Sequence, residues 1–252
     1  MGKTIDVIKV IIAINVVLAL VTFQVPGWED PMFETLALYF PKNEHFRYWQ
    51  LVTNMFMHGG LMHIVFNMYA LWAFGSPLLA QWGGKRFVLF YFLSGIGAGV
   101  IYLLINYFQF NALYNELVAA GISADDLQTL LKTGKYIPSA FSDVSKEKME
   151  TFYHLFAIPA VGASGAIYGV LVAFGMTYPN AKLALIFFPV PIAAKYFIPI
   201  LIGMDLFSGV TGVSIFGGGI AHFAHIGGAI IGFLLMWYWR GPREKSNVTI
   251  LE

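Results

Sequence analysis

The residues best suited to chemistry in this sequence are one serine and two histidines that lie in apolar stretches. Ser164 occupies a Gly-Ala-Ser-Gly motif at residues 162–165, and His222 and His225 lie near the start of an apolar stretch that ends at Trp239. A serine hydroxyl becomes a nucleophile when a base lies within about 2.6–3.2 Å of it. An isolated serine among small residues is more often a packing device between membrane helices. The catalytic hypothesis therefore depends on whether a histidine reaches the serine.

Other polar residues in apolar stretches could assist such a pair. His63 and Asn67 are four residues apart and share one helical face, so they could stabilise an oxyanion or hold helices together. Tyr168 lies one turn after the serine and could stack on the imidazole, although a lone tyrosine is ordinary core. Asp205 could orient the base, but we favour a structural role because it lies near the middle of a short apolar stretch.

The composition is that of a protein that crosses a membrane several times. Of the 252 residues, 58% are hydrophobic and 12% are charged, whereas soluble domains carry about 25% charged residues. A formal net charge of +1 leaves no basic surface large enough for nucleic acid. The sequence has no cysteine, no GxxxxGK[ST] phosphate loop and no HExxH zinc motif. We therefore expect an integral membrane protein in a lipid bilayer, with no cofactor, no metal and no nucleic-acid partner.

Six stretches are apolar and long enough, or nearly so, to cross a bilayer, which takes about 20 residues. They are Val7–Val25, Leu51–Ala73, Arg86–Tyr107, Gly162–Pro179, Tyr196–Thr211 and Ile220–Trp239. We expect the first to be a retained helix rather than a secretory signal, because no small-residue cleavage site follows it. The connection Asn180–Lys195 contains Pro189 and Pro191, which predict an irregular loop lying on the membrane.

Basic residues gather in the segments that would share one side of a six-helix bundle. They are Lys3, Lys9, Lys85, Arg86, Lys182, Lys195, Arg240, Arg243 and Lys245. Because basic loops stay in the cytoplasm, both termini are predicted to be cytoplasmic. The lack of an Arg-rich, acid-poor leader favours a bacterial inner membrane over an organelle.

The third loop, about Phe108–Val161, is the one sizeable polar region and is predicted to be extracytoplasmic. Ser123, followed by two acidic residues, predicts the start of a helix, and Gly134 predicts its end. A second helix is predicted over Ser145–Phe156. We expect this insertion to have no core of its own, and we interpret it as a cap on the bundle rather than a substrate-gating element.

Taken together, these residues resemble the rhomboid family of intramembrane serine proteases. The resemblance rests on Gly-Ala-Ser-Gly at 162–165, on Ala-His-Ile-Gly-Gly at 224–228 with Gly232, and on His-Gly-Gly-Leu-Met-His-Ile-Val-Phe-Asn at 58–67. Their order matches the six-helix core of the family over nearly the whole chain, apart from the third-loop insertion at about 108–161. The resemblance implies an all-α membrane protein in which residues 1–252 form a single rhomboid-like transmembrane domain, a six-transmembrane-helix bundle with an enlarged helical third loop.

The resemblance also implies a catalytic dyad. Ser164 would be the nucleophile and His225 the general base. His225 is favoured over His222 because glycines follow it at three and seven residues, as in the family pattern. A dyad without a carboxylate must depend on a well-formed oxyanion hole, since losing the aspartate of a soluble triad costs about 10⁴-fold in turnover.

The remaining family positions have supporting roles by the same resemblance. His63 and Asn67 would contribute to the oxyanion hole. His58 would be chiefly structural, and Tyr168 would pack on the base. Arg47 resembles the basic residue of the family's first loop.

The function implied is an intramembrane serine endopeptidase that cleaves transmembrane segments of other membrane proteins. Such a substrate must unwind locally, because a helix hides its carbonyl groups in hydrogen bonds. The alternatives are a catalytically silent relative that binds membrane proteins, and a metal-dependent membrane hydrolase using His222 and His225 with His58 and His63. A small-solute transporter is a further alternative, but no inverted repeat is evident.

Overall fold

The computed structural model describes residues 6–142, 144–185, 188–213 and 221–239. The helices in these ranges are α1 (Val7–Gln24), α2 (Glu29–Leu36), α3 (Gln50–Thr53), α4 (Leu61–Trp82), α5 (Gly84–Ala119), α6 (Ala124–Thr133), α7 (Lys146–Ala157), α8 (Ser164–Thr177), α9 (Ala194–Thr211) and α10 (His222–Trp239). Two 3-10 helices, η1 (Asn54–Phe56) and η2 (Pro138–Phe141), and two strands, β1 (Lys182–Leu185) and β2 (Phe188–Ala193), complete these elements. The predicted start of the sixth span at Ile220 and the basic residues 3, 240, 243 and 245 lie outside the described ranges.

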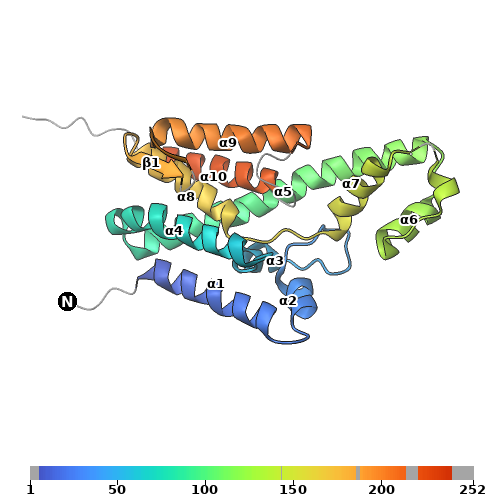
Figure 1. Cartoon of the computed structure of the whole chain (residues 1–252), viewed down its shortest axis with the longest axis horizontal. Coiled ribbons are helices and arrows are strands. Elements are labelled where there is room, and N and C mark those ends of the chain that lie inside the picture. The colour runs from blue at the N-terminus through green and yellow to red at the C-terminus, as the bar shows by residue number, and fades with distance from the viewer. Residues whose placement is uncertain (1–5, 143, 186–187, 214–220, 240–252) are drawn as a thin grey trace, which may run out of the picture.

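Helix α8 lies at the centre of a bundle formed with α4, α5, α9 and α10. It packs most extensively against α10 and α5, and α4 and α9 also contact it. Figure 1 shows α1, α4, α9 and α10 running along the long axis of the molecule, with α5 continuing beyond them. Every residue of α8 from Gly165 to Leu171 is buried. The helix that begins at Ser164 is therefore enclosed by its neighbours.

Each of the six predicted spans overlaps a long or apolar helix in the described part of the chain, namely α1, α4, α5, α8, α9 and α10. Of these helices, α1, α5 and α9 are long and apolar enough to cross a membrane, and α8 is a shorter apolar helix of 14 residues. Large apolar side chains are exposed on the outside of the bundle, among them Val17 in α1, Phe207 in α9 and Trp237 in α10. A helical bundle with an apolar exterior satisfies its backbone hydrogen bonds internally and suits a lipid environment.

The boundaries predicted for the second span were wrong. Residues 50–56 form the separate short helices α3 and η1, so α4 begins at Leu61 rather than at Leu51. It then continues past Ala73 and through Pro77 to Trp82. Hydropathy alone could not separate α3 from α4, because apolar residues occur on both sides of the break.

The third span was predicted too short. Helix α5 does not end at Tyr107 but continues to Ala119. No glycine or proline occurs between Tyr107 and Gly121, so the helix persists where the hydropathy falls. With 36 residues, α5 is about 54 Å long and exceeds the hydrocarbon layer of a bilayer, which is about 30 Å thick.

The two helices predicted within the insertion are confirmed. Helix α6 follows Ser123, whose side chain accepts a hydrogen bond from the N–H of Asp126, and it ends at Gly134 in the left-handed conformation. Helix α7 begins after Ser145, whose side chain caps it in the same way. Local capping chemistry therefore fixed these boundaries to within one or two residues.

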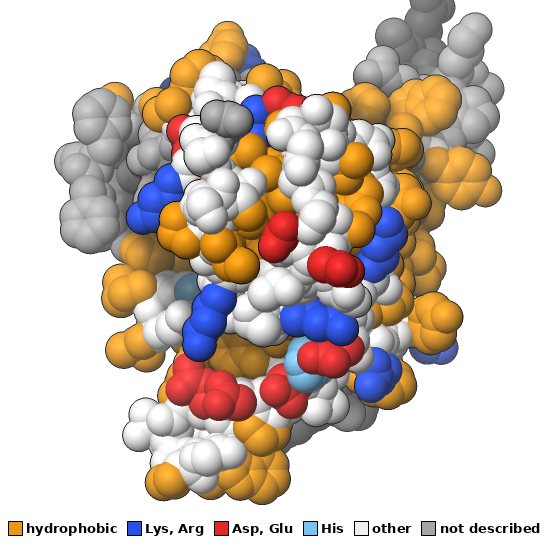
Figure 2. Space-filling model, turned by 90° about the vertical axis from the view of Figure 1, so that its right-hand side faces the viewer, with side chains coloured by type: hydrophobic (Ala, Val, Ile, Leu, Met, Phe, Trp, Pro, Cys, Tyr) orange, Lys and Arg blue, Asp and Glu red, His pale blue; other side chains and the backbone are white. Residues whose placement is uncertain are grey.

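The expectation that the insertion lacks its own core was wrong. The end of α5, together with α6, η2 and α7, forms a unit that we call the lobe. Its buried apolar side chains are Phe110, Leu117, Ile122, Leu127, Leu130, Phe141, Met149 and Phe152, with Phe40 of the first loop. The part of α5 beyond Tyr107 contributes Phe110 to this core, and the rings of Phe110 and Phe152 stack with centroids 4.7 Å apart. Figure 2, which faces this end of the molecule, shows acidic and basic side chains intermixed on its surface.

The connection between α8 and α9 contains a β-hairpin where an irregular loop was predicted. Strands β1 and β2 pair antiparallel, with Lys182 opposite Ala193 and Leu185 opposite Phe188. The prediction that prolines prevent a helix here is confirmed. Because alternate residues direct their N–H groups to the same edge of a strand, prolines two residues apart remove donors from one edge only. The other edge of β2 keeps its N–H donors and is the edge that pairs with β1.

Candidate active site

The extended segment before α8 fixes the position of Ser164. Ala160 exchanges two main-chain hydrogen bonds with Leu38 of the first loop, each 2.9 Å long. The N–H of Gly162 donates to the carbonyl oxygen of Asn54, also at 2.9 Å. Gly162 has a φ of 122°, which residues with a Cβ rarely adopt. The glycine therefore lets the chain turn into α8 with the serine at its first position.

Glycines bring α10 against α8. A Cβ added at Gly228 would overlap the carbonyl group of Gly165, with only 2.7 Å to its carbon. A Cβ added at Gly232 would lie 2.5 Å from the Cα of Gly169. The two backbones therefore touch directly, as small residues allow between membrane helices. Short side chains on these helices can meet only because of this close approach.

Ser164 and His225 are brought together by this packing. The Oγ atom of Ser164 and the Nε2 atom of His225 are 2.9 Å apart, within the range in which a hydroxyl donates to an imidazole. The His225 side chain is 13% exposed, so its ring is largely shielded from solvent. The pair has the geometry that base-assisted nucleophilic attack requires.

Tyr168 holds the imidazole from one face. Its ring stacks on that of His225 with centroids 4.3 Å apart and planes inclined by 13°. Its hydroxyl donates a hydrogen bond to the carboxylate of Asp205 on α9. The tyrosine one turn after the serine thus contacts both the histidine ring and the carboxylate behind it.

Asp205 lies behind the histidine, whereas we favoured a purely structural role for it from the sequence. Its carboxylate is 1% exposed, and its Oδ1 atom is 3.2 Å from Nδ1 of His225 and 2.6 Å from Nδ1 of His222. The sequence signal was an acidic residue within a membrane helix. The neighbours of Asp205 depend on the rotation of α9 about its axis relative to α10. The sequence contains no periodic pattern from which that rotation could be predicted.

The same three residues are also able to hold a metal ion. The ligand atoms of Asp205, His222 and His225 lie within 4.8 Å of one another. Two histidines and a carboxylate are a known ligand set for catalytic zinc. The hydrogen bonds among these groups, together with the Tyr168 hydroxyl, also satisfy the carboxylate without an ion.

His63 and Asn67 lie against the backbone just before the serine. A Cβ added at Gly162 would lie 2.8 Å from Nε2 of His63 and 3.5 Å from Nδ2 of Asn67. Nδ1 of His63 accepts a hydrogen bond from the N–H of Gly59 at 3.3 Å, so the ring proton of the neutral imidazole is on Nε2. Nδ2 of Asn67 is buried and has no hydrogen-bond partner within the described residues. Two N–H donors therefore converge near Gly162.

The other two residues singled out by the resemblance contact groups other than the serine. His58 is 2% exposed, and its ring packs edge-on against His63 with centroids 5.0 Å apart. Neither of its ring nitrogens has a partner in the part of the chain that the structure describes. Arg47 lies in the first loop and donates to the carbonyl oxygens of Glu44 and Phe46, each at 2.8 Å.

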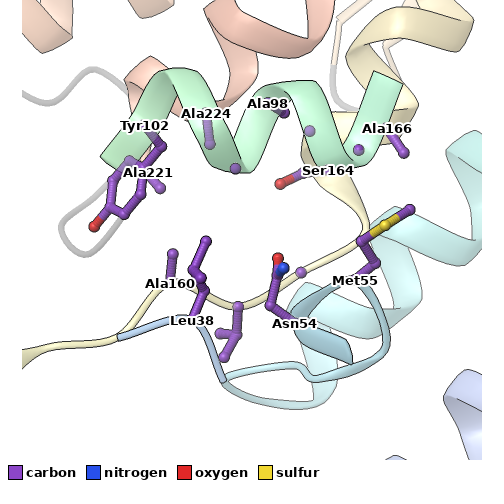
Figure 3. A pocket seen from close by; sticks show the side chains of 15 residues that line it. Leu38, Asn54, Met55, Ala98, Tyr102, Ala160, Ser164, Ala166, Ala221 and Ala224 are labelled. Carbon is purple, nitrogen blue, oxygen red and sulfur yellow. The ribbon is translucent and has the colours of Figure 1, made fainter. Parts of the chain in front are cut away.

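A small cavity adjoins the serine. Figure 3 shows the Ser164 side chain directed into a space bounded by Asn54, Met55 and Ala98. The volume of this cavity is about 20 Å³, which is room for one water molecule. Glycines and alanines make up most of the remaining lining, from Gly95 to Ala224. Only a small group fits in this cavity.

Comparisons with known proteins show the family to which the chain is similar. The Rhomboid domain family matches residues 45–242. The chain is 30% identical over 226 residues to presenilin-associated rhomboid-like protein A, mitochondrial, of Danio rerio, covering 88% of this chain and 45% of that protein. It is 29% identical over 215 residues to the Homo sapiens presenilin-associated rhomboid-like protein, mitochondrial, covering 84% and 43%. It is 27% identical over 202 residues to Rhomboid protein 1, mitochondrial, of Saccharomyces cerevisiae, covering 80% and 45%.

The chain thus spans less than half the length of these relatives. All three carry mitochondrial names, so they give no support to the bacterial inner membrane predicted from the sequence. The family match covers most of the chain and includes α4, α8 and α10, which carry the site. This integral membrane protein belongs to the rhomboid family.

Proposed function

We propose that this protein is an intramembrane serine endopeptidase that cleaves transmembrane segments of other membrane proteins. Ser164 is the nucleophile and His225 is the general base. The observation that carries the proposal is the 2.9 Å separation of Oγ and Nε2 within a bundle whose exterior is apolar. Membership of the rhomboid family supports the same class of reaction.

The chemistry follows from this pair. As Oγ of Ser164 attacks the carbonyl carbon, its proton passes to Nε2 of His225, and the carbonyl electron pair moves to the oxygen. When the C–N bond breaks, the imidazolium returns that proton to the leaving amine. Water then repeats the sequence on the acyl-enzyme: it loses a proton to Nε2, and the serine oxygen recovers one as it leaves. No cofactor is required in any of these steps.

The oxyanion is stabilised by donors around the start of α8. Nε2–H of His63, Nδ2–H of Asn67 and the main-chain N–H of Ser164 are the candidates. The proximity of the two side chains to Gly162 supports this role, as does the lack of a hydrogen-bond partner for Nδ2 of Asn67 in the described chain. Hydrogen-bond donors that are held in place before the reaction stabilise an oxyanion most strongly where water is excluded.

The substrate is a transmembrane helix that unwinds near the serine. Helical carbonyl groups are already hydrogen-bonded, so segments with glycine, proline or polar residues unwind at lower cost. The small lining of the cavity next to Ser164 supports a small residue at the cleaved bond. The lipid bilayer is the medium in which enzyme and substrate meet.

The test is cleavage of a reporter transmembrane substrate by purified protein in detergent. Ser164→Ala and His225→Ala should each abolish cleavage. The matched controls, Ser142→Ala beside η2 and His154→Ala in α7, should cleave like the wild type, because both residues are exposed on the lobe and lie outside the bundle around Ser164. Cleavage that survives Ser164→Ala would overturn the mechanism.

The two alternatives predict different results in the same assay. A metal-dependent hydrolase, favoured by the cluster of Asp205, His222 and His225, would lose activity with a chelator and retain it in Ser164→Ala. A silent binding relative would capture the reporter without cutting it, in both wild type and Ser164→Ala. The serine protease cleaves with the chelator present.

We further propose that both ends of the chain lie on the side rich in lysine and arginine. Lys85 and Arg86, at the start of α5, belong to that side. In a bacterial inner membrane, the location predicted from the sequence, this side is the cytoplasm. Because the chain has no cysteine, single cysteines placed at residues 85 and 135 should react with a membrane-impermeant thiol reagent from opposite sides. Reaction of both from one side would refute this topology.

A further inference from the structure

We infer that Asp205 is a positioning residue for His225, so that the site works as a serine, a histidine and a carboxylate supplied by three helices. This inference rests on the proposed function and extends it. The carboxylate comes from α9, the base from α10 and the nucleophile from α8. It differs from the dyad implied by the family resemblance, in which no acidic residue takes part.

The environment of Asp205 argues against simple helix packing. A buried carboxylate is costly unless several donors surround it, and here three groups converge on it. Oδ1 faces Nδ1 of His225 at 3.2 Å and Nδ1 of His222 at 2.6 Å, while the other carboxylate oxygen accepts from the hydroxyl of Tyr168. Both partners on α10 are histidines, and one of them already contacts Ser164. The charge is therefore next to the group that becomes cationic during the reaction.

The contact with Asp205 determines which nitrogen of His225 carries the proton. A carboxylate oxygen 3.2 Å from Nδ1 accepts a hydrogen bond, so Nδ1 is protonated in the neutral imidazole. Nε2 is then unprotonated and accepts from Ser164 at 2.9 Å. Without the carboxylate, the ring could adopt the other tautomer, in which Nε2–H points at the serine and cannot remove its proton.

Tyr168 and His222 keep this arrangement in place. The ring of Tyr168 lies flat against the imidazole while its hydroxyl binds the carboxylate, so one side chain restrains both members. His222 shares Oδ1 with His225 and limits rotation of the carboxylate. When His225 takes the serine proton, the fixed negative charge of Asp205 stabilises the imidazolium, and no proton needs to pass to the carboxylate.

The kinetic test uses Asp205→Asn, which keeps the shape of the side chain and removes its charge. We expect kcat to fall by about 10²–10⁴-fold, as for aspartate removal in soluble triads, with KM changed by less than about threefold because substrate binding is unaffected. Ser94→Ala, which removes another buried polar group from the bundle, should leave both constants unchanged. An unchanged kcat in Asp205→Asn, or a change confined to KM, would overturn the inference.

A second readout follows the serine directly. The rate at which a fluorophosphonate labels Ser164 should fall in Asp205→Asn in proportion to kcat, because labelling uses the same base. Binding of the reporter should be equal in Ser164→Ala and in Ser164→Ala with Asp205→Asn. Weaker binding in the double variant would assign Asp205 to substrate recognition and overturn the inference.

A measurement on the unmodified protein decides the matter even if Asp205→Asn does not fold. Nitrogen-15 NMR of labelled histidine, with the signal of His225 identified from His225→Ala, should show Nδ1 protonated and Nε2 unprotonated. The opposite tautomer would overturn the inference. Failure of the proposed function is seen separately, as a wild type that does not cleave or a Ser164→Ala variant that does.

Discussion

Replacing Gly228 by alanine should separate α8 from α10 and disable the serine without unfolding the protein. The added Cβ would lie 2.7 Å from the carbonyl carbon of Gly165, whereas carbon atoms in contact are normally about 3.5–4.0 Å apart. The position of the Cβ is fixed by the backbone of α10, and the carbonyl group belongs to the backbone of α8, so no side-chain rotation relieves the overlap. The carbonyl oxygen of Gly165 is closer still to the added Cβ, so helix α10 must retreat by at least about 1 Å.

Moving α10 away from α8 also increases the distance between Ser164 and His225, because His225 is one turn before Gly228. His225 is on the same helix, so its 2.9 Å distance from Ser164 should increase to at least about 4 Å, which is beyond hydrogen-bond reach. A displacement of about 1 Å in a catalytic group can cost about 10²-fold in rate. Overpacking of this kind also costs about 1–3 kcal/mol of stability. We therefore expect kcat to fall by at least about 10²-fold while the protein remains folded.

The assay compares kcat on the transmembrane reporter with the thermal unfolding midpoint in the same detergent. Gly203→Ala in α9 is the matched control, since a Cβ there meets no heavy atom within 4 Å. That variant should keep its activity and gain stability of up to about 1 kcal/mol from helix propensity. A folded Gly228→Ala protein that cleaves at the wild-type rate would refute the argument that glycine packing sets the distance between serine and histidine.

Three further predictions concern other parts of the molecule. Tyr168→Phe keeps the stacked ring but removes the hydroxyl that binds Asp205. We expect kcat to fall by about tenfold with KM unchanged, as for one lost hydrogen bond to a charged group. An equal loss of kcat in Tyr168→Ala would contradict the separate role of the hydroxyl. His63→Ala and Asn67→Ala should each lower kcat by about 10²–10³-fold, while fluorescence-monitored binding of the reporter is retained; a loss of binding alone would contradict the oxyanion role. Phe152→Ala should destabilise the lobe by about 3–5 kcal/mol, seen as faster proteolysis near α6 and α7, and uniform cleavage along the chain would contradict a separate lobe core.

That Ser164 and His225 lie close together could be predicted from the sequence because both residues carry local signals. Ser164 follows a glycine whose backbone conformation excludes other residues, and His225 precedes glycines that touch α8. Such packing positions are recognisable because only glycine permits them. Caps are equally local, so Ser123 and Gly134 correctly predicted the ends of α6.

The parts that were missed depend on contacts between distant segments. The rotation of α9, which directs Asp205 toward the histidines, follows from packing around the whole helix and leaves no local pattern. The lobe core needed α5 to extend past Tyr107 and present Phe110, and a hydropathy profile ends the helix too early. The hairpin between α8 and α9 was missed because prolines exclude a helix without indicating which edge of a strand can pair.

The groups around Ser164 belong to segments far apart in the sequence, so they are synthesised at different times during translation. Leu38 and Asn54 hold the chain before α8, and His225 follows the serine by 61 residues on α10. Contacts over such separations form only after the intervening chain has been ordered. Synthesis from the N-terminus produces α10 after all the other described helices, so under the proposed mechanism the serine has no base while α1 to α9 enter the membrane. An unfinished copy is then inert toward newly inserted membrane proteins, and proteolytic activity begins only when the molecule has been assembled.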